Sequence, residues 1–205
     1  MRAPAIRVCV LIALAGLLAG CGGKGGGKTT AGASAPGCEK VATPAPRRVS
    51  LKAPRQDVRP GEKLSAVVKT SCGTGIGTLF LAREFPQARV RGVDISEEMI
   101  AEAQAKIGLD PEGRVAFKVA DAADLPYDED SFDLVTQLNM PPFFGEVARV
   151  LRPGGYVVMA ASYGASTPFY TPAGVLERGF GRHGLHKVSD GEAGSGSYFV
   201  ARRPS

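Results

Sequence analysis

Histidines, long apolar runs and an excess of basic residues after position 69 are scarce or absent in this chain of 205 residues, and each lack argues against one class of function. Only two histidines are present, His183 and His186, and they lack the company of other metal ligands, so no zinc site is expected. The apolar run Val8–Leu18 is too short to span a bilayer, which takes about 20 residues. Residues 70–205 carry 13 Lys and Arg against 17 Asp and Glu, which argues against a surface that binds nucleic acid.

The positive charge of the chain is concentrated in its N-terminal arm. Residues 1–69 contain 12 Lys and Arg and 3 Asp and Glu, a net charge of +9, whereas residues 70–205 have a net charge of −4. With 44% hydrophobic residues, the chain has room for one α/β domain and an appendage. We therefore expect one folded domain behind a basic arm.

The first 21 residues have the layout of a targeting signal. Arg2 and Arg7 form a positively charged N-terminal region, the apolar run follows, and the signal ends with Leu18-Ala19-Gly20-Cys21. This layout resembles a bacterial lipoprotein signal peptide with its lipobox, which implies removal of residues 1–20 and lipidation of Cys21. The resemblance implies a protein anchored to the cell membrane by lipid. The alternative is a chance apolar N-terminus followed by a cysteine.

Residues 21–62 are predicted to be a flexible tether, rich in Gly and Pro, with a short strand-like segment at Val49–Leu51. In an oxidising compartment Cys38 and Cys72 could form a disulfide. Two free thiols are the alternative, and the sequence leaves both open.

The stretch Ser71–Gly77 reads Ser-Cys-Gly-Thr-Gly-Ile-Gly, and the rest of the chain is organised around it. It follows the apolar run Leu64–Thr70 and precedes a helical pattern through Phe85. A strand, a glycine-rich turn and a helix in this order leave backbone N–H groups free to face a ligand, and glycine keeps side chains out of the way. The motif predicts a nucleotide or nucleoside site without distinguishing dinucleotide, phosphate and adenosyl ligands.

Residues 63–205 form the predicted domain, in which strand and helix patterns alternate. Strands are expected over Arg89–Asp94, Arg114–Ala120, Phe132–Val135 and Tyr156–Ala161, and a closing pair over His186–Ser189 and Ser197–Ala201. Helices are expected from a Ser96 cap to Gly108, over Phe143–Leu151, and from Pro172 to about Arg182. The alternation predicts an α/β, Rossmann-like, doubly wound sheet that is mostly parallel and has an antiparallel closing strand.

Four motifs in this domain carry a family resemblance. They are Cys72-Gly73-Thr74-Gly75, Gly92-Val93-Asp94-Ile95-Ser96, Ala120-Asp121-Ala122 followed by Leu125-Pro126, and the segment Glu146–Gly155. In order and spacing, from about Leu64 to Arg203, they resemble the class I S-adenosylmethionine-dependent methyltransferases with a type 11-like domain. The resemblance implies the cofactor S-adenosyl-L-methionine and a small-molecule methyl acceptor.

The same resemblance implies a set of cofactor-binding residues. The glycine turn would lie against the methionine moiety and ribose, Asp94 would accept both ribose hydroxyls, and Asp121 would lie near the exocyclic amine of adenine. The full set is Cys72, Gly73, Thr74, Gly75, Asp94, Ile95, Met99, Asp121, Ala122 and Gln137. The alternatives are a helix N-terminal acid for Asp94 and a turn residue for Asp121.

Candidates for the acceptor site follow the fourth and fifth strands. Gln137 and the segment Asn139–Pro142 come after the fourth strand, and Tyr163, Phe169 and Tyr170 could line an acceptor pocket. Asn-Met-Pro-Pro distantly resembles the Asn-Pro-Pro-aromatic motif of amino-group methyltransferases, but Met140 interrupts it and an ordinary loop is favoured. No catalytic residue is assigned, because methyl transfer needs a general base only when the acceptor must lose a proton.

Two positions depart from the family pattern. Lys69 stands where the family has an acid, and Ser71 where it has glycine. A cation at position 69 is expected to repel the positive charges of the cofactor and to impair activity. The helical cap that the family places before the first strand is replaced here by the tether.

The charge step and both departures fall near residue 70, which suggests a lipoprotein N-terminus joined to a methyltransferase domain. If that join is an artefact, the domain is expected to be cytoplasmic. The second expectation for function is a non-catalytic, membrane-anchored lipoprotein whose α/β domain binds a nucleoside or a partner. The oligomeric state is open.

Overall fold

A computed structural model describes residues 64–108, 110 and 112–205. The strands are β1 (Ala66–Thr70), β2 (Arg89–Asp94), β3 (Val115–Val119), β4 (Phe132–Leu138), β5 (Leu151–Ala161), β6 (His186–Ala193) and β7 (Gly196–Arg202). The helices are α2 (Ile76–Glu84), α3 (Glu97–Ala105), α4 (Phe144–Val150), the 3-10 turn η2 (Gly164–Ser166) and α5 (Ala173–Gly181). The described residues therefore alternate between strand and helix from β1 to β5, as the sequence predicts, except that β4 follows β3 without a helix between them.

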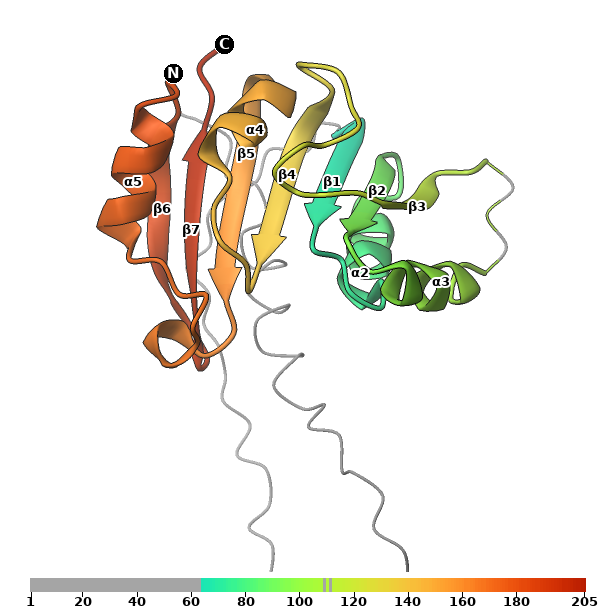
Figure 1. The fold of residues 1–205 in the computed structure, drawn as a ribbon. Helices are drawn as coiled ribbons and strands as arrows, with labels where there is room; N and C mark the ends of the chain where they lie inside the picture. The colour runs from blue at the N-terminus through green and yellow to red at the C-terminus, as the bar shows by residue number, and fades with distance from the viewer. Residues whose placement is uncertain (1–63, 109, 111) are drawn as a thin grey trace, which may run out of the picture.

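One seven-stranded sheet has the strand order β3-β2-β1-β4-β5-β7-β6. Neighbours from β3 to β5 are parallel, and β7 runs antiparallel to both β5 and β6. The predicted Rossmann-like sheet with an antiparallel closing pair is confirmed. The parallel strands all end at one edge of the sheet, the lower edge in Figure 1, which we call the carboxyl edge. The chain leaves β1 toward β2 and returns to β4 on the other side, so the strand order reverses there, where open α/β sheets bind ligands.

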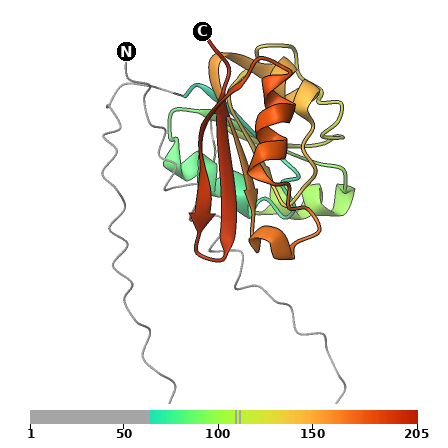
Figure 2. The ribbon, with the colours of Figure 1, turned by 90° about the vertical axis from the view of Figure 1, so that its left-hand side faces the viewer.

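Helices cover both faces of the sheet (Figure 2). Val68 packs on the α4 and α5 face, in a core that includes Val147 and Phe180. Val67 packs on the α2 face, in a core that includes Leu81. Both valines are buried because parallel strands between two helical layers have no solvent-facing side.

Helix α3 begins where the sequence places its cap. The Ser96 hydroxyl accepts a hydrogen bond from the Met99 amide at 3.2 Å, and Glu97 and Glu98 occupy the first turn, where acids favour the helix dipole. The helix packs over the end of the sheet through Ile100 and Ala103. Its first turn therefore lies beside the carboxyl ends of β2 and β3.

Strand β5 is longer than predicted. The segment Arg152–Gly155, expected to be a turn before the strand, belongs to β5, which starts at Leu151. The pairing of β4 with this longer β5 contains a register shift between Phe132 and Leu134 of β4. The Gly154 amide donates to the carbonyls of Arg203 and Pro204, so the C-terminal segment supplies the partners that a free turn would lack. Strand pairing that is distant in sequence overrides the local turn signal.

Several predictions concern residues outside the described ranges: the signal peptide 1–20 with Cys21, the tether 21–62 with its Val49–Leu51 strand, and Cys38. Cys72 is the cysteine of the described chain; it is buried and has no disulfide partner among the described residues. Its disulfide with Cys38 stays a prediction. Within the described ranges, the helices are too short or too polar to cross a membrane.

Candidate functional site

The loop 71–75, here called the glycine loop, connects β1 to α2 at the carboxyl edge. Three of its residues have left-handed backbones, with φ of 50° at Ser71, 52° at Gly73 and 83° at Gly75. Only glycine adopts this conformation without a steric penalty, so Ser71 carries strain of about 1 kcal/mol. The departure from glycine at this position thus has a physical consequence in the loop itself.

The loop amides are mostly used inside the protein. The Cys72 amide donates to the Val93 carbonyl at 2.9 Å, the Gly73 amide to Asp94 Oδ2 at 2.7 Å, and the Gly75 amide to the Cys72 carbonyl at 3.1 Å. The expectation that the N–H groups of this turn are free for a ligand is therefore wrong for these three. Their bonds fix the loop against the end of β2 instead.

The glycines of the loop differ in what they permit. A Cβ at Gly75 would lie 2.7 Å from Ala103 Cβ and 2.8 Å from Phe117 Cζ, so this glycine lets α3 and β3 pack against the loop. A Cβ at Gly92 would meet Phe117 in the same way. A Cβ at Gly73 would meet nothing within 4 Å. The open side of the loop is therefore at Gly73.

Asp94, the last residue of β2, joins the loop to the start of α3. Its Oδ2 accepts from the Gly73 amide at 2.7 Å and its Oδ1 from the Ser96 amide at 3.2 Å, and the side chain is partly exposed. A carboxylate oxygen has two lone pairs, so each oxygen keeps capacity for a further donor. Asp94 can hold the loop and a hydroxylated ligand at the same time.

Exposed apolar side chains stand at the element ends that meet near Asp94. Ile95 is 72% exposed, Ile76 52%, Val119 41% and Met99 39%, and they come from the ends of β2 and β3 and the first turns of α2 and α3. We call these four residues the apolar patch. Large apolar side chains gathered at one edge of a sheet are typical of a binding surface.

The segment after β3 reaches the same edge. The Ala120 amide donates to the Asp94 carbonyl at 2.9 Å, which brings the following Asp121 and Ala122 beside the end of β2. Asp121 is exposed, and its Oδ1 accepts from the Ala123 amide at 2.8 Å. The carboxylate therefore stabilises a turn, and its remaining acceptor sites face solvent.

A buried cation lies behind the glycine loop. Lys69 is 4% exposed, and its Nζ donates to the Ser71 carbonyl at 2.9 Å. Burial lowers the pKa of Lys69 to about 8, against the opposing influence of Cys72 and Asp94. Burial likewise raises the pKa of the Cys72 thiol to about 11, so this thiol is neutral at physiological pH.

Gln137, near the end of β4, has a buried amide without partners. The residue is 1% exposed, and neither Nε2 nor Oε1 has a hydrogen-bond partner among the described residues. In the sheet it stands in register with Thr70 on β1 and Met159 on β5. An unpaired buried amide costs stability, and such groups are concentrated where a ligand completes them.

The loop after β4 is fixed by its own side chains. Asn139 has φ of 53°, its Nδ2 donates to Ser162 Oγ at 2.9 Å, and its Oδ1 accepts from the Ser162 amide at 2.8 Å. Met140 turns back, so that its sulfur accepts a hydrogen bond from the Thr70 hydroxyl at 3.1 Å. Asn139 thus links the end of β4 to the end of β5, which agrees with the expectation that the segment Asn139–Pro142 is an ordinary loop.

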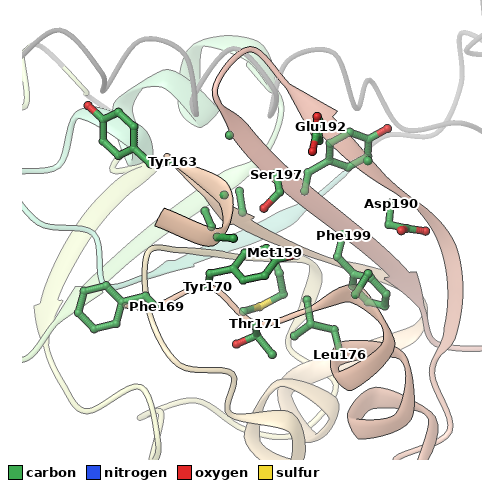
Figure 3. A pocket seen from close by; sticks show the side chains of 18 of the residues that line it. Met159, Tyr163, Phe169, Tyr170, Thr171, Leu176, Asp190, Glu192, Ser197 and Phe199 are labelled. Carbon is green, nitrogen blue, oxygen red and sulfur yellow. The ribbon is translucent and has the colours of Figure 1, made fainter. Parts of the chain in front are cut away.

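A cavity of about 470 Å³, here called the hairpin pocket, opens between the ends of β4 and β5, the η2 segment, the start of α5 and the β6–β7 hairpin. Met140 and Met159 line it, as do the predicted Tyr163, Phe169 and Tyr170. Figure 3 shows Tyr163 and Phe169 on one side of it and Asp190 and Glu192 on the other. Its volume suits a small organic molecule.

Sequence patterns predict the residues around the glycine loop better than those that line the hairpin pocket. The structure brings the glycine loop, Asp94, Ile95, Met99 and the Asp121 segment together, whereas Gln137 lies on β4, two strands from Asp94, in register with Thr70 and Met159. Sequence patterns do not point to Asp190 and Glu192 in the pocket wall, because both acids lie in an edge strand whose residues match no motif. His183 and His186 are exposed, in the turn after α5 and at the start of β6.

Residues 67–155 match the family model "Methyltransferase domain". Among curated proteins, the chain is 39% identical over 116 residues to Methyltransferase GfsG of Streptomyces halstedii, which covers 52% of this chain and 40% of that protein. It is 34% identical over 116 residues to the demethylmenaquinone methyltransferase of Lactococcus lactis subsp. lactis, covering 53% and 46%. The chain thus spans less than half the length of these two relatives.

Solved structures show the same fold at lower identity. A methyltransferase in complex with the Haloferax volcanii Trm112 activator superposes with a TM-score of 0.60 at 22% identity, over 71% of this chain and 85% of that one. Phosphoethanolamine N-methyltransferase 2 of Haemonchus contortus, solved with S-adenosyl-L-methionine, gives 0.58 at 18% identity, over 72% and 50%. Residues 67–155 therefore match a methyltransferase domain in sequence, and the described chain has the fold of class I S-adenosylmethionine-dependent methyltransferases of known structure.

Proposed function

We propose that this chain is an S-adenosylmethionine-dependent methyltransferase that acts on a small molecule. The observation that carries the proposal is Asp94, whose carboxylate joins the glycine loop at 2.7 Å and keeps acceptor capacity toward solvent, with the apolar patch beside it. A hydroxylated ring with an attached flat base needs this combination of an acceptor and an apolar surface. The family match over residues 67–155 supports the same cofactor.

Each residue of the edge has a proposed role. Asp94 accepts the ribose hydroxyls, Ile95 and Met99 contact the adenine ring, and Asp121 with Ala122 faces its amine edge. The loop from Cys72 to Gly75, with Thr74, runs along the methionine moiety, and Gln137 approaches it from β4. The exposure of Ile95 and Met99 supports their part, since an adenine ring would cover apolar surface that is otherwise in water.

The amino-acid end of the cofactor fits less well. Lys69 is a buried cation beneath the loop, and the cofactor carries an ammonium and a sulfonium. Like charges in a partly buried site repel by about 1 to 3 kcal/mol. We therefore propose a site that recognises chiefly the adenosine portion and binds the cofactor weakly.

The chemistry that the cofactor supplies when bound is an electrophilic methyl group on sulfur. Passing this methyl group to the acceptor atom would leave S-adenosylhomocysteine, held by the residues proposed for the cofactor. The residues of the chain have two tasks, which are to align the acceptor and to exclude water. Met140 is the residue of the hairpin pocket that contacts β1, through Thr70, so the acceptor would enter from the pocket past Met140.

Titration calorimetry of the full chain with S-adenosylhomocysteine tests the proposal. Asp94→Ala should weaken binding by about 2 to 4 kcal/mol, because charge-assisted hydrogen bonds to the ribose are lost. Asp94→Asn keeps an acceptor for the Gly73 amide and separates loop geometry from charge. Asp128→Ala, an exposed acid before β4, is the matched control and should bind as the wild type does. Equal affinity in Asp94→Ala would remove the adenosyl assignment.

A second candidate function rests on Lys69. With a cation at the position of the family's acid, the domain could be a non-catalytic module that binds a nucleoside or a partner, held at the membrane through a lipidated Cys21. A chain that is folded by circular dichroism but gives no heat with S-adenosylhomocysteine would favour this candidate over the first.

A further inference from the structure

The hairpin pocket has walls of one charge sign. Its lining includes two acids, Asp190 and Glu192, and among the described residues that line it there is no Lys, Arg or His. A pocket with this lining favours a cation and disfavours an anion, and because both carboxylates lie at its exposed rim, solvent and salt screen part of that preference.

The sheet register places both acids on the pocket side. Asp190 pairs with Phe199 and Glu192 with Ser197 in the β6–β7 ladder. Paired residues in such a ladder project from the same face of the sheet, and Phe199 packs into the core beneath α5. The carboxylates therefore lie on the α5 face, which is the face that the pocket occupies (Figure 3).

Neighbouring cations only partly neutralise this wall. Lys187 lies 3.5 Å from Asp190 but 2.8 Å from Glu177 of α5, so one ammonium serves two carboxylates. Glu192 has no ion pair within the described chain. Glu177, Asp190 and Glu192 against Lys187 sum to a net charge of −2, which becomes −1 when Arg178 of α5, whose guanidinium lies near Gly174, is counted.

The rest of the pocket is apolar and aromatic. Met159, Leu176 and Phe199 are buried, and Tyr163 and Phe169 are about half exposed on the opposite side. Aromatic faces attract ammonium groups, and the buried side chains suit a hydrocarbon or aromatic body.

The two ends of the pocket lie far apart in the sheet. Met140, next to Thr70 of β1, marks the end near the glycine loop, and the acids lie on the edge strand β6. From β4 to β6 there are three strand spacings of about 4.8 Å, or roughly 14 Å. A molecule that reaches both ends needs a charged group well separated from the atom near the cofactor.

We infer that the methyl acceptor carries a protonated amine, or another cation, at the end remote from the atom that is methylated. This inference rests on the proposed function, because it takes the hairpin pocket as the acceptor site. Asp190 and Glu192 bind the cation, the aromatic and apolar residues hold the body, and the nucleophilic atom lies at the Met140 end.

Two probes of equal skeleton and opposite charge test the inference. 4-(4-Hydroxyphenyl)butylamine and 4-(4-hydroxyphenyl)butanoate are titrated into the full chain with S-adenosylhomocysteine present, at low ionic strength, where surface charges are least screened. The amine should bind about 5- to 10-fold more tightly. In the double variant Asp190→Asn, Glu192→Gln this preference should disappear, with an unchanged melting temperature. The control, Asp128→Asn with Glu129→Gln, removes two exposed acids before β4 and should keep the preference.

Three results overturn the inference: equal or tighter binding of the butanoate, a preference that survives in the Asp190, Glu192 double variant, or no binding of either probe. Heat from S-adenosylhomocysteine in the same samples separates this failure from that of the proposed function. If the cofactor product binds and the amine preference is absent, only the acceptor class is wrong.

Discussion

At the scale of single residues, Lys69 is the side chain that bears most directly on whether a positively charged cofactor can bind at the glycine loop. Burial lowers its pKa from 10.5 to about 8, so the folded protein holds this proton less firmly than the unfolded chain does. Between pH 8 and 10.5 the unfolded state binds more protons, and stability rises with pH. Below pH 8 both states are protonated and the full cost of the buried charge, about 3 kcal/mol, is present.

Lys69→Met should therefore stabilise the protein at pH 7 by up to about 3 kcal/mol, because it keeps the aliphatic body and removes the charge. The gap to the wild type should shrink by about 1 kcal/mol between pH 7 and 9. Urea denaturation of the full chain at both pH values measures it, and the titration of the Cys72 thiol, whose pKa is 9.0 in the unfolded chain, is common to wild type and variant, so that most of its effect cancels in the gap. Lys118→Met, at an exposed position of β3, is the control and should show no such gap. A variant less stable than wild type, or a gap that does not change with pH, would contradict the assignment.

Gln137 carries a second residue-scale prediction. Gln137→Leu removes a buried amide that has no partner, so it should stabilise the free protein by about 1 to 3 kcal/mol. If the amide serves the cofactor, the same change should weaken binding of S-adenosylhomocysteine about tenfold. Thermal unfolding and calorimetry on one preparation give both values.

The control for Gln137 is Thr78→Val. Thr78 Oγ1 is also buried without a partner, but it lies on the side of α2 that packs against Gly92 of β2 and has no proposed ligand contact. This variant should gain stability and keep its ligand affinity. Loss of stability together with unchanged affinity in Gln137→Leu would mean that the glutamine is a structural residue.

At the scale of elements, sequence patterns predict correctly the strands and helix ends that are determined by residues close together in the chain. Strand β2 has its predicted bounds, and Ser96 caps α3, because a hydroxyl that accepts from an amide three residues on needs no distant partner. The start of β5 was mispredicted, because the Gly154 amide bonds to residues at the far end of the chain. No sequence window contains that pairing.

The site shows the same division. Asp94 could be predicted, because a carboxylate at the end of the second strand is part of a motif. The hydrogen-bonding state of the glycine-loop amides could not be predicted, because only the fold shows that the Gly73 amide already donates to Asp94. Gly75 was assigned to ligand access, whereas its missing Cβ leaves room for Ala103. The acids of the hairpin pocket come from residues more than 90 positions after Asp94, which only the sheet order brings to the same edge.

At the scale of the whole molecule, the chain combines a basic N-terminal arm with an acidic domain. If the lipobox is used, Cys21→Ser should leave an uncleaved precursor and abolish incorporation of a labelled fatty acid. Metabolic labelling in a bacterial host, with immunoblotting for precursor size, measures both. Cys38→Ser is the matched control and should be labelled as the wild type is. Labelling that persists in Cys21→Ser would exclude this cysteine as the anchor.

The central claim, that the adenosyl cofactor lies on the carboxyl edge of β1 and β2, is tested most directly by backbone amide chemical shifts of the full chain during titration with S-adenosylhomocysteine. We predict that the signals of Gly73, Ile95, Met99 and Ala122 move together and saturate with one dissociation constant. Signals of residues 128–131, before β4 at the opposite edge, should stay in place. Shifts confined to that opposite edge, or none at saturating ligand, would contradict it.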